Sequence, residues 1–137
     1  MPDAIFPVEM ARGVPVVSAP EEIDITNADG LRAALLESAE RTPGMFVVDL
    51  TRTQFCDTAG LHALVSARKR AHARGGEVVL VMPGAAVRRI FAITGLDHVF
   101  TVFMSLEEAL AQVPGVASGR PRPDVLPAED GDENSQP

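Results

Sequence analysis

The chain has 137 residues, of which 46% are hydrophobic and 4% aromatic, and its formal net charge is −7. This size and composition predict one domain with an aliphatic core. The acidic charge and the scarcity of aromatic rings argue against a nucleic-acid binder, and the charge also argues against binding to an anionic membrane surface.

The first two predicted elements are short strands. Residues 1–12 form an N-terminal segment with a weak strand at Ile5–Val8, and the β-branched run Val14–Val17 predicts a stronger one. Pro15 interrupts this run. Because proline cannot donate a backbone hydrogen bond, we expect an edge or terminal strand.

Helical periodicity and apolar runs then alternate along the chain. Polar capping residues mark the helix starts: Thr26–Asn27, then Asp57 or Thr58, and finally Ser105. The patterns predict helices at 26–42, 58–74, 83–94 and 105–113, and strands at 45–50, 77–82 and 99–103. This order predicts an α/β fold, in which a mostly parallel central sheet of four to five strands alternates with helices through right-handed crossovers.

The composition changes at Pro114. Residues 114–137 contain five prolines, three glycines and five acidic residues, without apolar periodicity. Such a segment cannot bury enough surface to offset its ordering entropy. We therefore expect one folded domain at 13–113 and a disordered acidic tail at 114–137.

The chain lacks the common enzyme signatures. It has no phosphate-binding loop, no dinucleotide-binding glycine motif and no serine-hydrolase elbow. His62, His72 and His98 lack the paired spacing of a metal site. We expect no catalytic residue, no cofactor and no bound metal.

The single cysteine, Cys56, excludes an internal disulfide, and neither a signal peptide nor a membrane span is visible. A cytoplasmic protein fits these features. We expect Cys56 to be a small buried hydrophobe whose pKa the neighbouring Asp57 raises. The alternative, a redox sensor, requires an exposed thiol with a low pKa.

The most informative stretch is Phe55–Leu61. An apolar strand ends, Asp57 and Thr58 follow, and the small residues Ala59 and Gly60 open a helix. Sites in parallel α/β sheets gather at the carboxyl ends of strands, and small residues leave a helix N-terminus open to a partner. An alternative is that Thr58 serves only as the helix N-cap.

Asp57–Leu61 resembles the D-[ST]-x-G-L signature of STAS domains in bacterial anti-sigma factor antagonists. Three further stretches agree with this family in order and spacing, and the resemblance covers roughly Gly13–Val113; these stretches are Glu22–Asp24, Arg74–Val78 and Ala86–Leu96. Two positions depart from the family pattern: Glu21 replaces a glycine, and His62 replaces a residue that is often small.

The resemblance implies a partner-binding regulator that phosphorylation switches off. Thr58 falls on the family's phosphoacceptor position. The implied partners are an anti-sigma factor that is also a serine/threonine kinase, and a phosphatase that acts on phosphorylated Thr58. The unmodified protein binds the kinase and frees a sigma factor. The residues expected at the partner-binding surface are Glu22, Asp24, Thr26, Asn27, Asp57, Ala59, Gly60, Leu61 and His62.

Two other functions remain open from the sequence. The chain could be a STAS subunit of a scaffold or lipid-transport complex, in which Thr58 is never phosphorylated, or a small-ligand-binding α/β protein or enzyme. A dense set of basic residues on the second helix is expected to form a solvated face, with a docking patch for an acidic partner as the alternative. This set comprises Arg68, Lys69, Arg70, His72 and Arg74.

Overall fold

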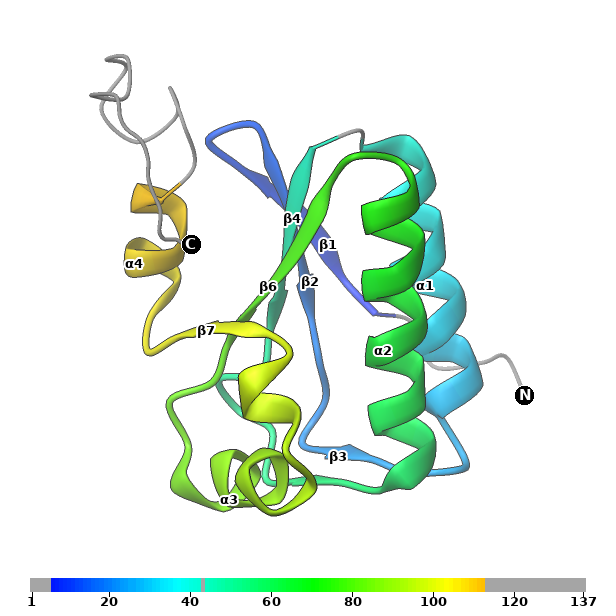
Figure 1. Ribbon diagram of the computed structural model, residues 1–137, viewed down its shortest axis with the longest axis vertical. Helices are drawn as coiled ribbons and strands as arrows, with labels where there is room; N and C mark the ends of the chain where they lie inside the picture. The colour runs from blue at the N-terminus through cyan, green and yellow to red at the C-terminus, as the bar shows by residue number, and fades with distance from the viewer. Residues whose placement is uncertain (1–5, 43, 113–137) are drawn as a thin grey trace.

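A five-stranded sheet forms the centre of the protein (Figure 1). The computed structural model describes residues 6–42 and 44–112. The strands lie in the order β1-β2-β4-β6-β7, and only the β1–β2 pair is antiparallel. They are β1 (Val8–Ala11), β2 (Val14–Ser18), β4 (Met45–Asp49), β6 (Glu77–Val81) and β7 (Thr101–Phe103). This confirms the predicted α/β fold with a mostly parallel sheet.

Helices cover both faces of the sheet, but unequally. They are α1 (Ala28–Arg41), α2 (Thr58–Ala73), α3 (Ala85–Thr94) and α4 (Leu106–Ala111), with a short 3-10 helix, η1, at Leu96–His98. The two long helices, α1 and α2, lie side by side on one face, while α4 covers the other (Figure 1).

Alternate strand residues serve the two faces. Val17, Val48 and Leu80 belong to the core under α1 and α2, whereas their neighbours Val16, Val47 and Val79 belong to the smaller core under α4. Burial on both faces explains why these strands read as continuous apolar runs in the sequence.

The N-terminal strands differ from the prediction. The first strand spans Val8–Ala11, not Ile5–Val8, and Ile5 lies outside the described residues. A two-residue turn joins it to β2, with Arg12 at φ 54° and Gly13 at φ 80°. Positive φ at both central residues is typical of the tight turn that matches the twist of a hairpin.

The prediction that Val14–Val17 is an edge strand is wrong, because β2 lies between β1 and β4. Pro15 is tolerated at this inner position because it pairs only with Met10 of β1. The pairing of β2 with β4 begins one residue later, at Val16. The missing N–H therefore falls outside the parallel ladder.

The remaining boundaries agree closely with the sequence. The last strand starts at Thr101 instead of Val99, because the chain first forms η1 after Gly95, which has the left-handed φ of 80°. The last helix ends at Ala111. The predicted tail at 114–137 lies outside the described residues.

A second, two-stranded sheet was not expected. It consists of β3 (Glu22–Ile23) and β5 (Phe55–Cys56), and it lies at the end of the domain where α2 begins (Figure 1). The run Phe55–Cys56 therefore leads into α2 from this small sheet, and not from a strand of the central sheet. A strand of two residues is too short to show the alternation of apolar and polar residues by which strands are predicted from sequence.

Candidate functional site

The small sheet joins two segments that are far apart in the sequence. β3 and β5 pair in parallel with Ile23 opposite Cys56. The backbone N–H of Asp57 then donates to the carbonyl oxygen of Ile23 at 2.9 Å. The loop 24–27 is thereby placed beside the start of α2, so the two stretches that the sequence singled out meet at one site.

Asp57, and not Thr58, caps α2. The Asp57 carboxylate accepts a hydrogen bond from the backbone N–H of Gly60 at 3.2 Å, which satisfies one of the free donors at the helix start. Thr58 is the first residue of the helix and is exposed. The alternative that Thr58 is the N-cap is therefore wrong. Among the described residues, its hydroxyl has no hydrogen-bond partner.

Gly60 allows α2 to begin close against the small sheet. A Cβ atom at this position would lie 2.5 Å from Cγ2 of Ile23 and 2.6 Å from Sγ of Cys56, distances at which a neighbour must move. Both neighbours are buried. Gly60 and Leu61 are also buried, so neither presents a side chain to solvent. The small size of Gly60 serves this internal contact, whereas the sequence pattern predicted that it leaves the helix start open to a partner.

Hydrogen bonds hold the loop before α1 in one conformation. The Asp24 carboxylate accepts from the hydroxyl of Thr26 and, at 2.9 Å, from its backbone N–H. The Asn27 side chain accepts from the Asp24 N–H at 2.9 Å and donates to the Glu22 carbonyl at 2.8 Å. The bonds from Thr26, the hydroxyl first, lower the pKa of Asp24. Asp24 is therefore an ionised carboxylate at neutral pH.

Two exposed apolar side chains stand at this site, and the sequence analysis missed both. Ile25 lies between Asp24 and Thr26 and is 79% exposed, while Phe55 in β5 is 46% exposed. A signal existed for Ile25, because the polar residues Asp24 and Thr26 flank it, and polar turns run over the surface of a domain. Phe55 carried no comparable signal, since its face of β5 depends on pairing with β3.

Half of the polar residues of the site are acidic. Its carboxylates come from both joined segments and lie at Glu21, Glu22, Asp24 and Asp57. Ala59 is half-buried, and His62 is exposed on α2, one turn beyond Thr58. The accessible part of the site thus combines the exposed threonines Thr26 and Thr58, the apolar side chains of Ile25 and Phe55, His62 and several negatively charged carboxylates.

Cys56 lies beneath the site. It is 2% exposed, and burial, followed by the charge of Asp57, raises the pKa of its thiol from 9.0 to about 12. This confirms the prediction of a small buried hydrophobe. A redox sensor requires an exposed thiol with a low pKa, whereas the Cys56 thiol is buried and its pKa is raised.

Three basic residues at the C-terminal end of α2 form ion pairs away from this site. His72 pairs with Glu77 at 2.5 Å, and Arg70 and Arg74 both pair with Glu40 across α1 and α2, at 2.9 and 3.4 Å. These contacts favour the solvated-face interpretation for Arg70, His72 and Arg74. Arg68 differs, because it is half-buried and its Nε has no hydrogen-bond partner among the described residues.

Within residues 6–42 and 44–112, no three potential metal-ligating side chains gather at one place. In the same residues, no helix has the length and apolarity needed to cross a membrane.

Comparison with known proteins places this geometry in context. The sequence pattern of the STAS domain matches residues 6–109. The anti-sigma-F factor antagonist RsfB of Mycobacterium tuberculosis is 32% identical over 120 residues, which cover 87% of this chain and 95% of RsfB. A crystal structure of an anti-sigma factor antagonist from Mycobacterium paratuberculosis is 33% identical, with a TM-score of 0.72 over 82% of this chain and 97% of that one.

The fold also resembles that of Bacillus SpoIIAA. Its phosphorylated form is 22% identical, with a TM-score of 0.61 over 79% of this chain and 98% of that one. An unphosphorylated form of SpoIIAA, described as an anti-sigma factor antagonist, is 23% identical, with a TM-score of 0.66 over 79% of this chain and 95% of that one.

Proposed function

This chain belongs to the STAS domain family, and from that membership we propose that it is an anti-sigma factor antagonist, which binds an anti-sigma factor and so releases a sigma factor. The observation that carries the proposal is the joint between β3, β5 and α2, which presents the exposed Thr58 on a fixed backbone. The names of the relatives from the two mycobacteria support the same function. The chain acts by binding and needs no catalytic residue of its own.

The proposed switch is phosphorylation of Thr58 by the anti-sigma factor acting as a kinase. The γ-phosphoryl group of ATP passes to the threonine oxygen, ADP leaves, and the hydroxyl proton is released; a phosphatase later hydrolyses the ester. Thr58 suits this role because its hydroxyl is exposed and is not the cap of α2. SpoIIAA, which shares the fold, has been solved in both phosphorylated and unphosphorylated forms.

Electrostatics explains why the phosphate would end binding without unfolding the domain. It adds about −1.5 to −2 charges at pH 7 beside Asp57. The helix N-terminus stabilises an anion, so α2 tolerates the group. A partner surface that fits a neutral hydroxyl must instead desolvate this charge, and a buried unpaired charge weakens an interface strongly.

The surface offered to the partner contains the exposed residues Ile25, Thr58 and His62, with Asp24 and Asp57 beside them. Ile25 sits in a turn that hydrogen bonds already hold in place. Little ordering entropy is therefore lost when a partner buries it. We assign it as an apolar anchor of the interface.

Two substitutions at Thr58 test the switch. Thr58→Ala should bind the anti-sigma kinase as the wild type does and should resist phosphorylation. Thr58→Glu should bind about 10- to 1,000-fold more weakly. The free energy of unfolding of both variants should lie within about 0.5 kcal/mol of the wild-type value, because Thr58 is exposed and Asp57 remains as the cap. Calorimetry measures binding, urea denaturation measures stability, and mass spectrometry after incubation with kinase and ATP locates the phosphate.

A wild-type affinity of Thr58→Glu, together with no phosphate on Thr58, would contradict the switch. The chain would then be a STAS subunit that is not phosphorylated, such as one in a scaffold or a lipid-transport complex.

The anchor assignment has its own matched control in Ile93. This isoleucine on α3 is 77% exposed, almost the same as Ile25. In the same calorimetric assay, Ile25→Ala should weaken kinase binding by about tenfold or more, since truncating an apolar anchor costs more than about 1 kcal/mol. Ile93→Ala should leave the affinity unchanged. Equal effects of the two substitutions would remove Ile25 from the interface.

A further inference from the structure

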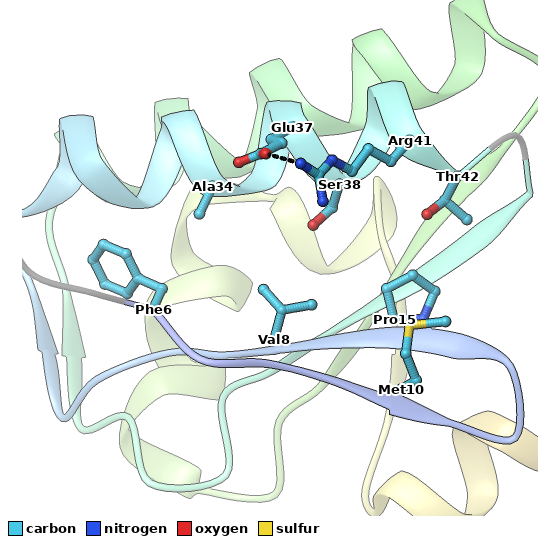
Figure 2. Close-up of a pocket in the computed structure, with 9 residues that line it drawn as sticks. All are labelled: Phe6, Val8, Met10, Pro15, Ala34, Glu37, Ser38, Arg41 and Thr42. Atoms are coloured by element: carbon cyan, nitrogen blue, oxygen red, sulfur yellow. Dashed lines mark ion pairs between the residues drawn. The ribbon is translucent and has the colours of Figure 1, made fainter.

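A groove lies between the β1–β2 hairpin and the C-terminal half of α1 (Figure 2). Its volume is about 340 Å³. It is separate from the Thr58 site, because α1 starts at that site with its N-cap Asn27 and reaches the groove only near its other end, at Arg41. Pockets of roughly 300–1,000 Å³ are the usual size for small ligands in proteins.

The sheet side of the groove is apolar. Val8 and Met10 are two residues apart in β1, so their side chains lie on the same face and point toward α1 (Figure 2). Phe6 and Pro15 continue this surface. Val8 is 49% exposed and Met10 is 65% exposed. Exposed apolar side chains that line a hollow favour binding, since a ligand removes them from water.

The helix side of the groove carries a hydroxyl, on a residue that is otherwise almost fully buried. Ser38 is only 7% exposed, and its oxygen points from α1 into the groove (Figure 2). Among the residues that the structure describes, this hydroxyl has no hydrogen-bond partner. Because this oxygen opens on the groove, solvent can reach it, and a ligand that fills the groove must offer Ser38 a donor or acceptor in place of water.

The groove has no net charge to attract an ion. Of the described residues that line it, only Glu37 and Arg41 are charged, and they pair with each other at 2.9 Å (Figure 2). Charge complementarity therefore favours a neutral ligand over an anion or a cation.

We propose that this groove binds a small neutral amphipathic molecule, with its apolar body against Val8 and Met10 and a hydroxyl or amide group hydrogen-bonded to Ser38. A second copy of the chain is the less suitable occupant. β1 is only four residues long and carries the charged Glu9, and short charged edge strands discourage pairing between molecules. An apolar strand edge would also leave the Ser38 hydroxyl unsatisfied.

Titration of the full ¹⁵N-labelled chain with 1-octanol tests the proposal. The amide signals of Val8, Met10, Ser38 and Thr42 should shift saturably, and octanoate and octylammonium, which have the same chain with a charge, should bind more weakly. Ala34→Phe places a ring inside the groove and should abolish these shifts. The control Ala33→Phe lies on the exposed side of the same helix and should preserve them. Ser38→Ala should weaken binding by about two- to tenfold, the effect of one hydrogen bond.

Several results would overturn the proposal. They are no saturable shift, shifts elsewhere in the domain, tighter binding of either charged analogue, or full binding by Ala34→Phe. Sedimentation velocity adds one more: a wild-type dimer that becomes monomeric in Met10→Lys would make the groove an interface between copies. Because Ser38→Ala retains the shape of the groove, it keeps the test valid if Ala34→Phe fails to fold.

Discussion

Neighbouring residues at the start of α2 have separate tasks. Asp57 closes the helix by accepting the N–H of Gly60, and Thr58 leaves its hydroxyl exposed. In a residue that was both cap and phosphoacceptor, the oxygen that accepts the capping bond would itself be modified. Dividing the tasks would let Thr58 be phosphorylated, as we propose, while Asp57 keeps the helix start in place.

The buried thiol of Cys56 predicts a dependence of stability on alkaline pH. Its pKa in the folded chain is about 12, against 9.0 ordinarily. As pH rises from 9 toward 12, the unfolded chain releases this proton and the folded chain keeps it, so the free energy of unfolding falls; below pH 9 the contribution is complete. The chain has no tyrosine and a single lysine, so few other groups titrate in this range.

Urea denaturation between pH 8 and 11 measures this effect. The control is Cys56→Ala, which should show a flatter dependence above pH 9. At pH 8 the folded wild type should react slowly with a thiol reagent, and the urea-unfolded chain should react at once. Rapid labelling of the folded chain would show that the thiol is accessible.

At the scale of elements, the site depends on a contact between a helix and two very short strands. β3 and β5 are each two residues long, so their pairing alone contributes little stability. They are held because Ile23 and Cys56 pack under the start of α2 at Gly60. The loop 24–27 and Thr58 therefore keep their relative positions through packing more than through strand pairing.

Gly60→Ala tests this contact. The added methyl group has no room, and overpacking costs about 1–3 kcal/mol. The better helix propensity of alanine returns up to about 1 kcal/mol, so we expect a net loss of up to about 2 kcal/mol. The matched control is Gly44→Ala, where a Cβ meets nothing within 4 Å and φ is not positive. Urea midpoints compare the two, and equal stability of both variants would show that the joint can expand.

On the scale of the whole molecule, the two faces of the sheet are unequal. One carries α1 and α2 over the larger core, and the other carries the six-residue α4. The Thr58 site and the groove both involve α1, at its opposite ends. Two surfaces of different chemistry are thus supported by one rigid element of the larger layer.

Removal of residues 114–137 should leave this architecture intact. The described elements end at Ala111, and the family pattern ends at residue 109. The melting temperature of a chain that ends at Val113 should stay within a few degrees of the full length, since about 1 kcal/mol corresponds to roughly 4–8 °C for a small domain. Circular dichroism follows the transition. A decrease beyond this range would mean that the acidic segment contributes to the fold.

The sequence by itself determined the features that local patterns encode. Apolar runs and capping residues predicted the alternating elements, and four stretches in register, Asp57–Leu61 among them, predicted the family. The tertiary structure alone decided the rest: the inner position of β2, the pairing of β3 with β5, the burial of Gly60, and the exposure of Ile25 and Phe55. These depend on contacts between segments distant in the chain, and periodicity along one segment carries no information about which partner covers it.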